Sequence, residues 1–191
     1  MTRLLTVILT AATMIVSTGF AMADQEFNPI AQLFGFNPGS TGGPGPIPRT
    51  TVSFQGNYAP GTIIIDTKER RLYLVQDGGR ALRYGIGVGR DGFRWGGVHR
   101  ITAKKEWPSW SPPSQMLRRR PDLPRHMVGG PDNPLGARAM YLGSTLYRIH
   151  GSNEPETIGQ AVSSGCFRMV NDDVIDLYNR VQVGATVVVK N

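Results

Sequence analysis

The chain has 191 residues, of which 40% are hydrophobic and 18% charged, and its formal net charge is +7 at neutral pH. This length is enough for one hydrophobic core, and the excess of basic residues suits an anionic partner such as nucleic acid or cell wall. The one cysteine, Cys166, excludes an internal disulfide, so it is either a buried small side chain or a reactive thiol.

The first 23 residues have the pattern of a secretory signal peptide. Arg3 precedes an apolar run over residues 4–15, and residues 21–23 read Ala-Met-Ala, the small-x-small end of a cleavage site. The alternative is a membrane anchor, but the run is shorter than the roughly 20 residues that a span needs. We therefore expect cleavage after Ala23 and export to the periplasm, which makes nucleic acid the poorer partner.

The next segment, residues 24–59, is expected to be a tether. Nine of the fourteen residues from 35 to 48 are Gly or Pro, and such a segment neither packs a core nor holds a helix. Residues 49–59 leave an edge strand open. Residues 60–191 then form a single domain of ordinary size, without an internal repeat.

Strand signals dominate this domain. β-branched and aromatic residues favour strands over residues 62–66, 72–75, 81–88, 98–104, 139–149 and 186–189. Only one clear helix follows, because Asn171 is placed to cap it and Val174, Leu177 and Val181 recur at helical spacing. The pattern predicts a mostly β fold.

A cysteine and a histidine are the candidate reactive pair. His150 ends one of the predicted strands, and Cys166 lies in a loop or short strand just before the helix. An imidazole can take the proton of a thiol near neutral pH and later give it to a leaving group. Gly165 permits a sharp turn before the cysteine and leaves backbone amides free to face an oxyanion. These neighbours favour the reactive interpretation of Cys166 over the buried one.

Two motifs surround this pair. Residues 150–159 read HGSNEPETIG, and residues 163–169 read SSGCFRM. They resemble the signature of the L,D-transpeptidase catalytic domain, or YkuD domain, of bacterial cell-wall enzymes. The resemblance extends to WPSWSPP at 107–113 and GPDNPLGARAM at 130–140, and covers about residues 60–190. Ser164 departs from the family pattern, because most members have a second histidine there.

The resemblance implies a fold and a reaction. The fold would be a β-sandwich or barrel-like arrangement of sheets with one or two short helices and the active site at the sheet rim. The substrate would be the tetrapeptide stem of peptidoglycan, cleaved between its third residue and D-alanine through a cysteine thioester. The acyl group would pass to another stem peptide or to an outer-membrane protein, and carbapenems would be inhibitors.

The resemblance also implies roles for individual residues. Cys166 would be the nucleophile and His150 the proton acceptor and donor, with the imidazole oriented by the backbone carbonyl of Gly151. The residues implied for substrate binding and the oxyanion are Ser164, Gly165 and Arg168.

Two other function classes stay open. One is an L,D-carboxypeptidase or another cell-wall cysteine hydrolase, such as an endopeptidase or amidase, which would use the same pair without transfer. The other is an inactive wall-binding domain, which would tolerate loss of the thiol. The presence of both His150 and Cys166 argues against the inactive domain.

Other motifs carry less chemistry. Residues 87–92 fit the spacing of a dinucleotide fingerprint, but no amphipathic helix follows, which favours a strand connection. His99 and His126 have no nearby ligand partners, so we expect no metal and no other cofactor. The basic cluster Arg118–Arg120 is interpreted either as a solvated loop or as a contact to anionic cell-wall polymer or substrate carboxylates.

Overall fold

The structure is a computed structural model that describes residues 45–191. The predicted signal peptide and the first part of the expected tether therefore lie outside the described residues. The mostly β prediction is confirmed. In chain order the elements are β1 (Thr50–Ser53), β2 (Ile63–Asp66), β3 (Arg71–Gln76), β4 (Arg80–Gly85), β5 (Val88–Gly89), β6 (Gly97–Glu106), α2 (Ser114–Arg119), β7 (Arg138–Leu142), β8 (Arg148–His150), the 3-10 turn η1 (Pro155–Thr157), β9 (Ala161–Ser163), β10 (Phe167–Arg168), α3 (Asn171–Arg180) and β11 (Thr186–Lys190).

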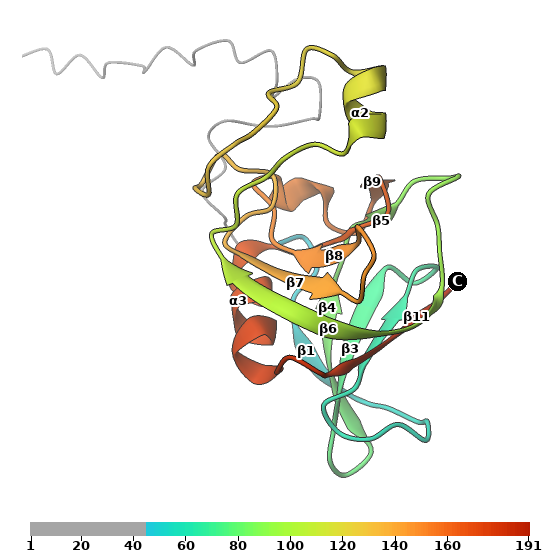
Figure 1. Ribbon diagram of the computed structural model, residues 1–191. Coiled ribbons are helices and arrows are strands. Elements are labelled where there is room, and N and C mark those ends of the chain that lie inside the picture. Colours follow the sequence, from blue (N-terminus) through green and yellow to red (C-terminus); the bar gives the residue numbers. More distant parts are fainter. Residues whose placement is uncertain (1–44) are drawn as a thin grey trace, which may run out of the picture.

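Nine strands form one curled sheet in the order β1-β4-β3-β2-β11-β6-β7-β8-β10, and β5 pairs separately with β9 (Figure 1). The curl is centred on β6. Its residues 97–100 pair with β11, its residues 101–106 pair with β7, and the register shifts between Ile101 and Ala103. Such an irregularity bends a strand and increases its twist. The end of the sheet that carries β8 and β10 is thereby turned relative to the end that carries β1.

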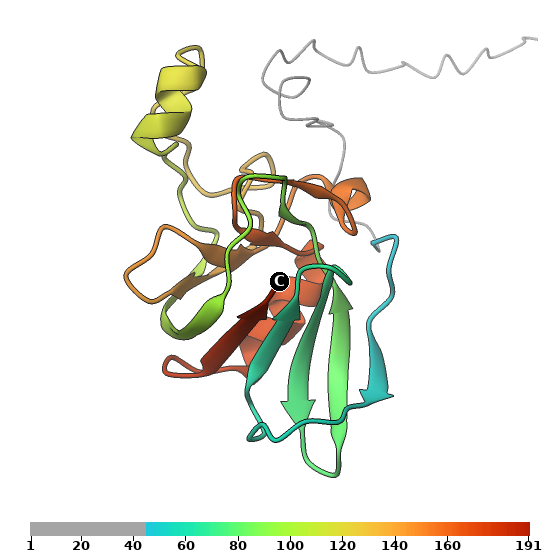
Figure 2. The same cartoon turned by 90° about the vertical axis from the view of Figure 1, so that its right-hand side faces the viewer.

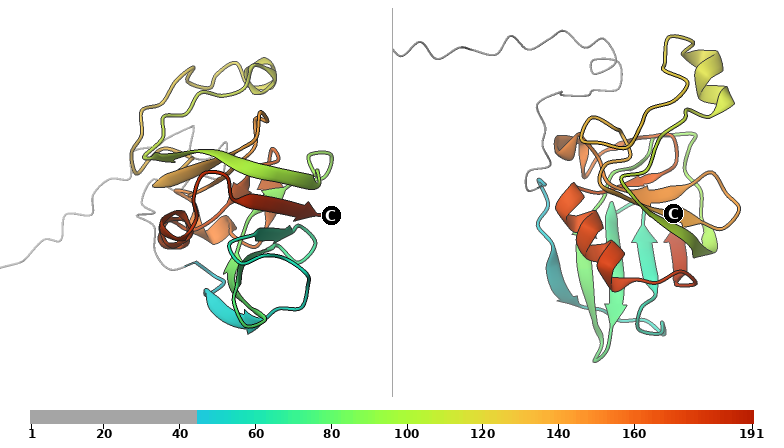
Figure 3. Two further views of the ribbon diagram at one scale, coloured as in Figure 1. Left: turned by 60° about the horizontal axis from the view of Figure 1, so that its bottom comes forward. Right: turned by 60° about the vertical axis from the view of Figure 1, so that its left-hand side comes forward.

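The main core lies between the sheet and α3, which crosses one face of it (Figures 1 and 3). Val174 and Leu177 are fully buried on the inner face of this helix, and they pack into a cluster with Tyr84 and Met140. Burying a Val or Leu side chain contributes about 1.5–3 kcal/mol. The cluster also contains Phe167, the residue after the cysteine, so the start of β10 is fixed by core packing.

A second, smaller core supports the segment that carries α2, which stands beyond the sheet in Figure 2. It consists of Trp110, Leu123 and Leu135, with Met116 of α2 packed against it. Trp110 and Met127 exchange two backbone hydrogen bonds of 2.8 and 2.7 Å. These contacts hold α2 at a fixed place next to the sheet without making it part of the main core.

The edge strand that the sequence left open at 49–59 is present. β1 pairs antiparallel with β4 at the end of the sheet. Arg49, just before it, forms ion pairs with Asp173 and Asp176 of α3, at 3.4 and 3.2 Å. Residues 49–53, which lie within the expected tether at 24–59, therefore pack on the domain.

Three local predictions need correction. The strand expected at 81–88 ends at Gly85, and the one expected at 139–149 is a hairpin whose turn contains Gly143 at φ +58°. Asn171 does not cap α3, because Val170 is the N-cap and Asn171 Oδ1 instead accepts the N–H of Ala137 at 2.9 Å.

Among residues 45–191 no helix is both long enough and apolar enough to cross a membrane.

Candidate active site

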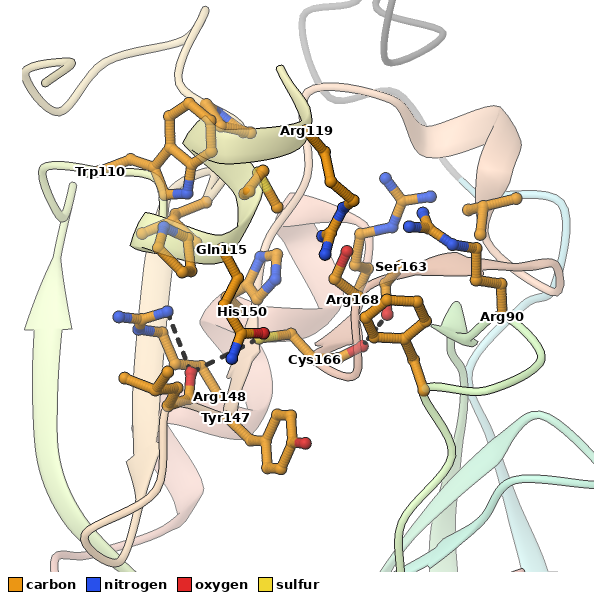
Figure 4. A pocket seen from close by; sticks show the side chains of 18 residues that line it. Arg90, Trp110, Gln115, Arg119, Tyr147, Arg148, His150, Ser163, Cys166 and Arg168 are labelled. Atoms are coloured by element: carbon orange, nitrogen blue, oxygen red, sulfur yellow. Dashed lines mark hydrogen bonds between the residues drawn. The ribbon is translucent and has the colours of Figure 1, made fainter. Parts of the chain in front are cut away.

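Two short parallel strands bring Cys166 and His150 together. β8 ends at His150, and β10 begins directly after Cys166. The strands pair with Arg168 opposite His150, so the cysteine lies beside the start of β8. Both side chains line one pocket of about 360 Å³ at this end of the sheet (Figure 4). The expected position at the sheet rim is therefore where the two residues meet.

The imidazole of His150 is fixed in one orientation. It is 5% exposed, and its Nδ1 lies 2.6 Å from the carbonyl oxygen of Gly151. Because a carbonyl only accepts, Nδ1 carries the proton and Nε2 keeps its lone pair. Burial is the main reason why the pKa of His150 falls to about 3; the Gly151 carbonyl raises it, and the charges of Arg168 and Arg148 lower it. The ring is neutral near pH 7 and able to accept a proton at Nε2.

Cys166 is partly exposed, and its Sγ lies 3.9 Å from the carbonyl oxygen of Leu146. Burial raises the pKa of the thiol, while the charge and hydrogen bonding of Arg148 and the charge of Arg168 lower it. The net shift is upward, so the resting pair is a neutral thiol beside a neutral imidazole. The thiolate then forms by transfer of the proton to His150 during attack.

Ser163 holds the turn that carries the cysteine. Its Oγ donates to the carbonyl oxygen of Cys166 at 2.6 Å and accepts the N–H of Gly165 at 3.1 Å. Gly165 has φ +109°, and a Cβ at this position would collide with the ring of Tyr147. Trp95 Nε1 donates to the Gly165 carbonyl at 2.7 Å. The turn needs glycine, and hydrogen bonds fix it on both sides.

The amides of this turn differ in what they can offer an oxyanion. The N–H of Gly165 is engaged by Ser163, so the sequence-based expectation that it faces an oxyanion is not met. None of the hydrogen bonds within residues 45–191 uses the N–H of Cys166. Ser164, which replaces the second histidine of the motif, lines the pocket. The Cys166 amide is thus the better candidate donor.

Arg168 is tied to the loop between His150 and the cysteine. Its Nη1 donates to Oε2 of Glu154 and its Nη2 to Oγ1 of Thr157, each at 2.8 Å. Glu154 is fully buried, and the Arg168 side chain is 12% exposed. These contacts make Arg168 a residue that orients the loop, and they engage the guanidinium that the resemblance implied for substrate binding. Nothing in the sequence marked Glu154, whose burial depends on how the loop folds over β10.

Further arginine and aromatic side chains line the pocket and were missed as site residues. Arg90 and Phe93 follow β5, Arg119 comes from the end of α2, and Arg148 comes from β8. Arg119 belongs to the basic cluster for which a substrate contact was one interpretation. Arg118, next to it, is exposed and is not among the lining residues. Apart from that cluster, no local sequence signal pointed to these positions.

Residues 87–92 form a strand connection, as the sequence favoured. Gly87 exchanges two backbone hydrogen bonds with Arg168, at 2.8 and 2.9 Å, and β5 pairs in parallel with β9. No helix begins there to receive a dinucleotide phosphate. His126 Nδ1 lies 3.1 Å from Ser111 Oγ. Over the described range 45–191, no group of three or more His, Cys, Asp or Glu side chains is placed to hold a metal ion.

Comparison with known proteins gives one consistent family. Residues 60–189 match the model of the L,D-transpeptidase catalytic domain, YkuD. "Probable L,D-transpeptidase ErfK/SrfK" of Escherichia coli K12 is 37% identical over 134 residues, which are 65% of this chain and 42% of that protein. The chain thus spans less than half the length of such curated relatives.

Two solved structures have the same fold. A Brucella melitensis protein described as a probable carnitine operon oxidoreductase is 46% identical, with a TM-score of 0.52, over 81% of this chain and 96% of its own. The catalytic domain of Enterococcus faecium L,D-transpeptidase, solved acylated by ertapenem, is 21% identical, with a TM-score of 0.54, over 71% of this chain and 100% of its own. The second likeness concerns the fold alone.

Proposed function

Because the chain belongs to the L,D-transpeptidase (YkuD) catalytic domain family, we propose that it is an exported cysteine L,D-transpeptidase that acts on peptidoglycan. Its acyl donor is the tetrapeptide stem, cleaved between the third residue and the terminal D-alanine. The observation that carries the proposal is the pocket shared by Cys166 and His150, in which the Gly151 carbonyl holds Nδ1 and leaves Nε2 to accept a proton.

In the first step the sulfur of Cys166 attacks the carbonyl carbon of the third residue while Nε2 of His150 takes the thiol proton. We assign the N–H of Cys166 as a donor to the oxyanion that forms. The bond to D-alanine then breaks, the imidazolium gives its proton to the departing amine, and a thioester remains. In the second step an amine attacks the thioester and loses a proton through His150, which restores the thiol and forms a new amide.

The nature of the second amine decides the product. An amine of another stem peptide gives a cross-link, and an amine of an outer-membrane protein anchors that protein to the wall. With water in place of the amine, the same thioester is hydrolysed and the enzyme is a carboxypeptidase. The proposal gives priority to amines because the matched family consists of transpeptidases.

The test is mass spectrometry of the mature protein incubated with a disaccharide tetrapeptide, with Cys166→Ala and His150→Ala alongside and Arg118→Gln as a surface control. A dimer that forms with release of D-alanine, and only when both residues are present, is the expected result. If tripeptide forms without dimer, even with an added amine acceptor, the protein hydrolyses the thioester and does not transfer the acyl group. Unchanged tetrapeptide would favour the inactive wall-binding domain.

The same thiol is proposed to react with carbapenems, as the E. faecium domain does with ertapenem. Opening of the β-lactam ring by the Cys166 sulfur adds the whole drug to the protein and loses no atom. Intact mass measurement should therefore show the mass of one drug molecule added to the wild type and none added to Cys166→Ala. Addition to both proteins would place the reaction elsewhere.

The export of the chain and its division into segments are further proposals. Residues 1–23 would be removed as a signal peptide. Of the expected tether, residues 24–59, the part before Arg49 would connect the mature N-terminus to the folded unit, because residues 49–53 already pack on the catalytic domain expected at 60–191. N-terminal sequencing of the protein recovered from the periplasm of an expressing Gram-negative cell should begin at Asp24. Recovery of the uncleaved chain in the membrane fraction would instead support the anchor.

A further inference from the structure

One side of the pocket is built from two arginines and an aromatic ring. The guanidinium carbons of Arg90 and Arg119 lie 4.5 and 5.6 Å from the centroid of the Phe93 ring. All three residues line the pocket that contains Cys166. Figure 4 shows Arg90 and Arg119 on one side of the cysteine and Arg148 on the other.

These two cations have no anionic partner among the described residues. The acid nearest to Arg90 in sequence, Asp91, forms its ion pair with Arg94 at 2.9 Å. The acid nearest to Arg119, Asp122, forms its ion pair with Arg120 at 2.7 Å. Neither Arg90 nor Arg119 occurs in an ion pair within residues 45–191, and the pocket lining contains neither Asp nor Glu. Two like charges that share one ring repel each other, and an anion between them relieves the repulsion.

The backbone fixes Arg90 relative to the nucleophile. The N–H of Arg90 donates to the carbonyl oxygen of Ser163 at 3.0 Å, and Ser163 holds the Cys166 turn. The carbonyl oxygen of Arg90 accepts the N–H of Phe93 at 2.9 Å, which closes a tight turn between the arginine and the ring. A ligand held by Arg90 is therefore held in register with the residue that attacks.

We propose that Arg90 and Arg119, arranged on Phe93, form a subsite that binds a carboxylate of the acyl donor. The inference rests on the proposed function, because that function supplies a donor whose anionic groups near the reacting amide are carboxylates. Guanidinium groups form paired hydrogen bonds with carboxylates, and such contacts orient a substrate as well as attract it. Two groups of the acyl donor could supply this carboxylate: the terminal carboxylate of the leaving D-alanine and a side-chain carboxylate of the third residue.

The test is a cycle in which enzyme and donor are changed separately and together. The enzyme forms are wild type, the double variant Arg90→Gln/Arg119→Gln, and the control Arg118→Gln, which removes the same charge from an exposed neighbour outside the pocket. The donors are a diaminopimelate-containing tetrapeptide with both carboxylates free, one with the terminal carboxylate amidated, and one with the third-residue carboxylate amidated. The rate of release of D-alanine or D-alaninamide gives kcat and KM.

In wild type we expect one of the two amidated donors to show KM raised about tenfold, the combined effect of two exposed charge contacts. The double variant should show the same rise with the free donor and no further rise with that amidated donor. Arg118→Gln should behave as wild type, and the identity of the sensitive donor names the carboxylate. If amidation raises KM as much in the double variant as in wild type, or if Arg118→Gln raises KM equally, the subsite proposal is wrong.

Failure of the proposed function would look different. If wild type releases D-alanine from none of the donors, the function fails, and binding to Cys166→Ala still decides the subsite. Isothermal titration of the free tetrapeptide into Cys166→Ala should then give a Kd that rises about tenfold when Arg90 and Arg119 are also changed. An unchanged Kd, with the folded fraction verified by circular dichroism, would overturn the subsite whatever the reaction is.

Discussion

The buried ion pair between Glu154 and Arg168 gives the sharpest prediction about stability. Glu154 is 0% exposed and the Arg168 side chain 12%, with 2.8 Å between Nη1 and Oε2. Glu154→Gln keeps the shape and an acceptor but removes the counter-charge of a guanidinium that has little access to water. Removing one partner of a buried pair costs about 3–5 kcal/mol. A domain of this kind is stable by roughly 5–15 kcal/mol, so the loss is a large share of the total.

The assay is urea unfolding followed by circular dichroism, with Glu156→Gln as the matched control. Glu156 is exposed on the same loop, and its neutralisation should change the free energy of unfolding by less than about 0.5 kcal/mol. Because Arg168 fixes the loop beside the nucleophile, Glu154→Gln should also lower the rate of D-alanine release. The reasoning is refuted if Glu154→Gln unfolds within about 1 kcal/mol of wild type.

Replacing both Glu154 and Arg168 by apolar residues tests whether the buried ion pair itself stabilises the fold. Burial raises the pKa of Glu154 in spite of Arg168, and it lowers the pKa of Arg168 in spite of Glu154. Both shifts indicate that desolvation exceeds the attraction between the partners. We therefore expect Glu154→Leu/Arg168→Met to recover most of the stability that Glu154→Gln loses, as replacement of buried pairs by apolar residues often does. A double variant less stable than Glu154→Gln would contradict this.

Three further predictions concern single groups. The rate constant for alkylation of Cys166 by iodoacetamide should rise continuously from about pH 6 to about pH 9, because burial raises the thiol pKa above the usual value of roughly 8.5. A rate that is already constant at pH 6 would instead indicate a thiolate–imidazolium pair between Cys166 and His150 in the resting protein. Lys104→Met should lower the free energy of unfolding by about 2 kcal/mol, because Nζ of Lys104 donates to the carbonyls of Tyr178 and Val181 at the end of α3, at 2.6 and 2.7 Å. Replacement of the exposed Lys105 by Met is the control. Equal losses in the two variants would show that these hydrogen bonds do not stabilise the fold. Burial raises the pKa of Asp173 to about 6, so the native state binds this proton more tightly than the unfolded state. As the pH rises from about 4 to about 7, the free energy of unfolding of the wild type should therefore fall by about 3 kcal/mol relative to that of Asp173→Asn. Urea unfolding that gives parallel curves of stability against pH for the two proteins would disprove this.

The sequence predicted the features whose signal is local. Strand positions follow from runs of β-branched residues, and β2 and β11 were expected within one residue of their observed starts. The interruption at 143–147 was missed because apolar residues flank it on both sides, although residues 143–145 read Gly-Ser-Thr. There the left-handed Gly143 and a 2.6 Å hydrogen bond from Thr145 Oγ1 to the Leu142 carbonyl turn the chain. The cluster of Gly, Ser and Thr was a local turn signal, but the flanking apolar residues outweighed it in the strand prediction.

The arginines of the pocket could not be predicted for a different reason. Arg90, Arg119 and Arg148 come from three elements that meet only because β5 pairs with β9 and the second core fixes α2. Long-range pairing of this kind leaves no mark on the residues next to each arginine. Cys166 and His150 were predictable because each lies beside a glycine within a recognisable motif: Gly165 has φ +109°, and a Cβ at Gly151 would collide with Oδ1 of Asn171.

The arrangement of charges separates substrate binding from activation of the thiol. Arg148 and Arg168 lower the pKa of both Cys166 and His150, so their charges largely cancel in the transfer of a proton from one to the other. Burial does not cancel, because it raises the thiol pKa and lowers the imidazole pKa. The groups that favour the transfer must act on one partner each: the Gly151 carbonyl stabilises the imidazolium, and hydrogen bonding from Arg148 stabilises the thiolate. More positive charge on the pocket rim would therefore do little for the nucleophile, which is consistent with assigning Arg90 and Arg119 to the donor.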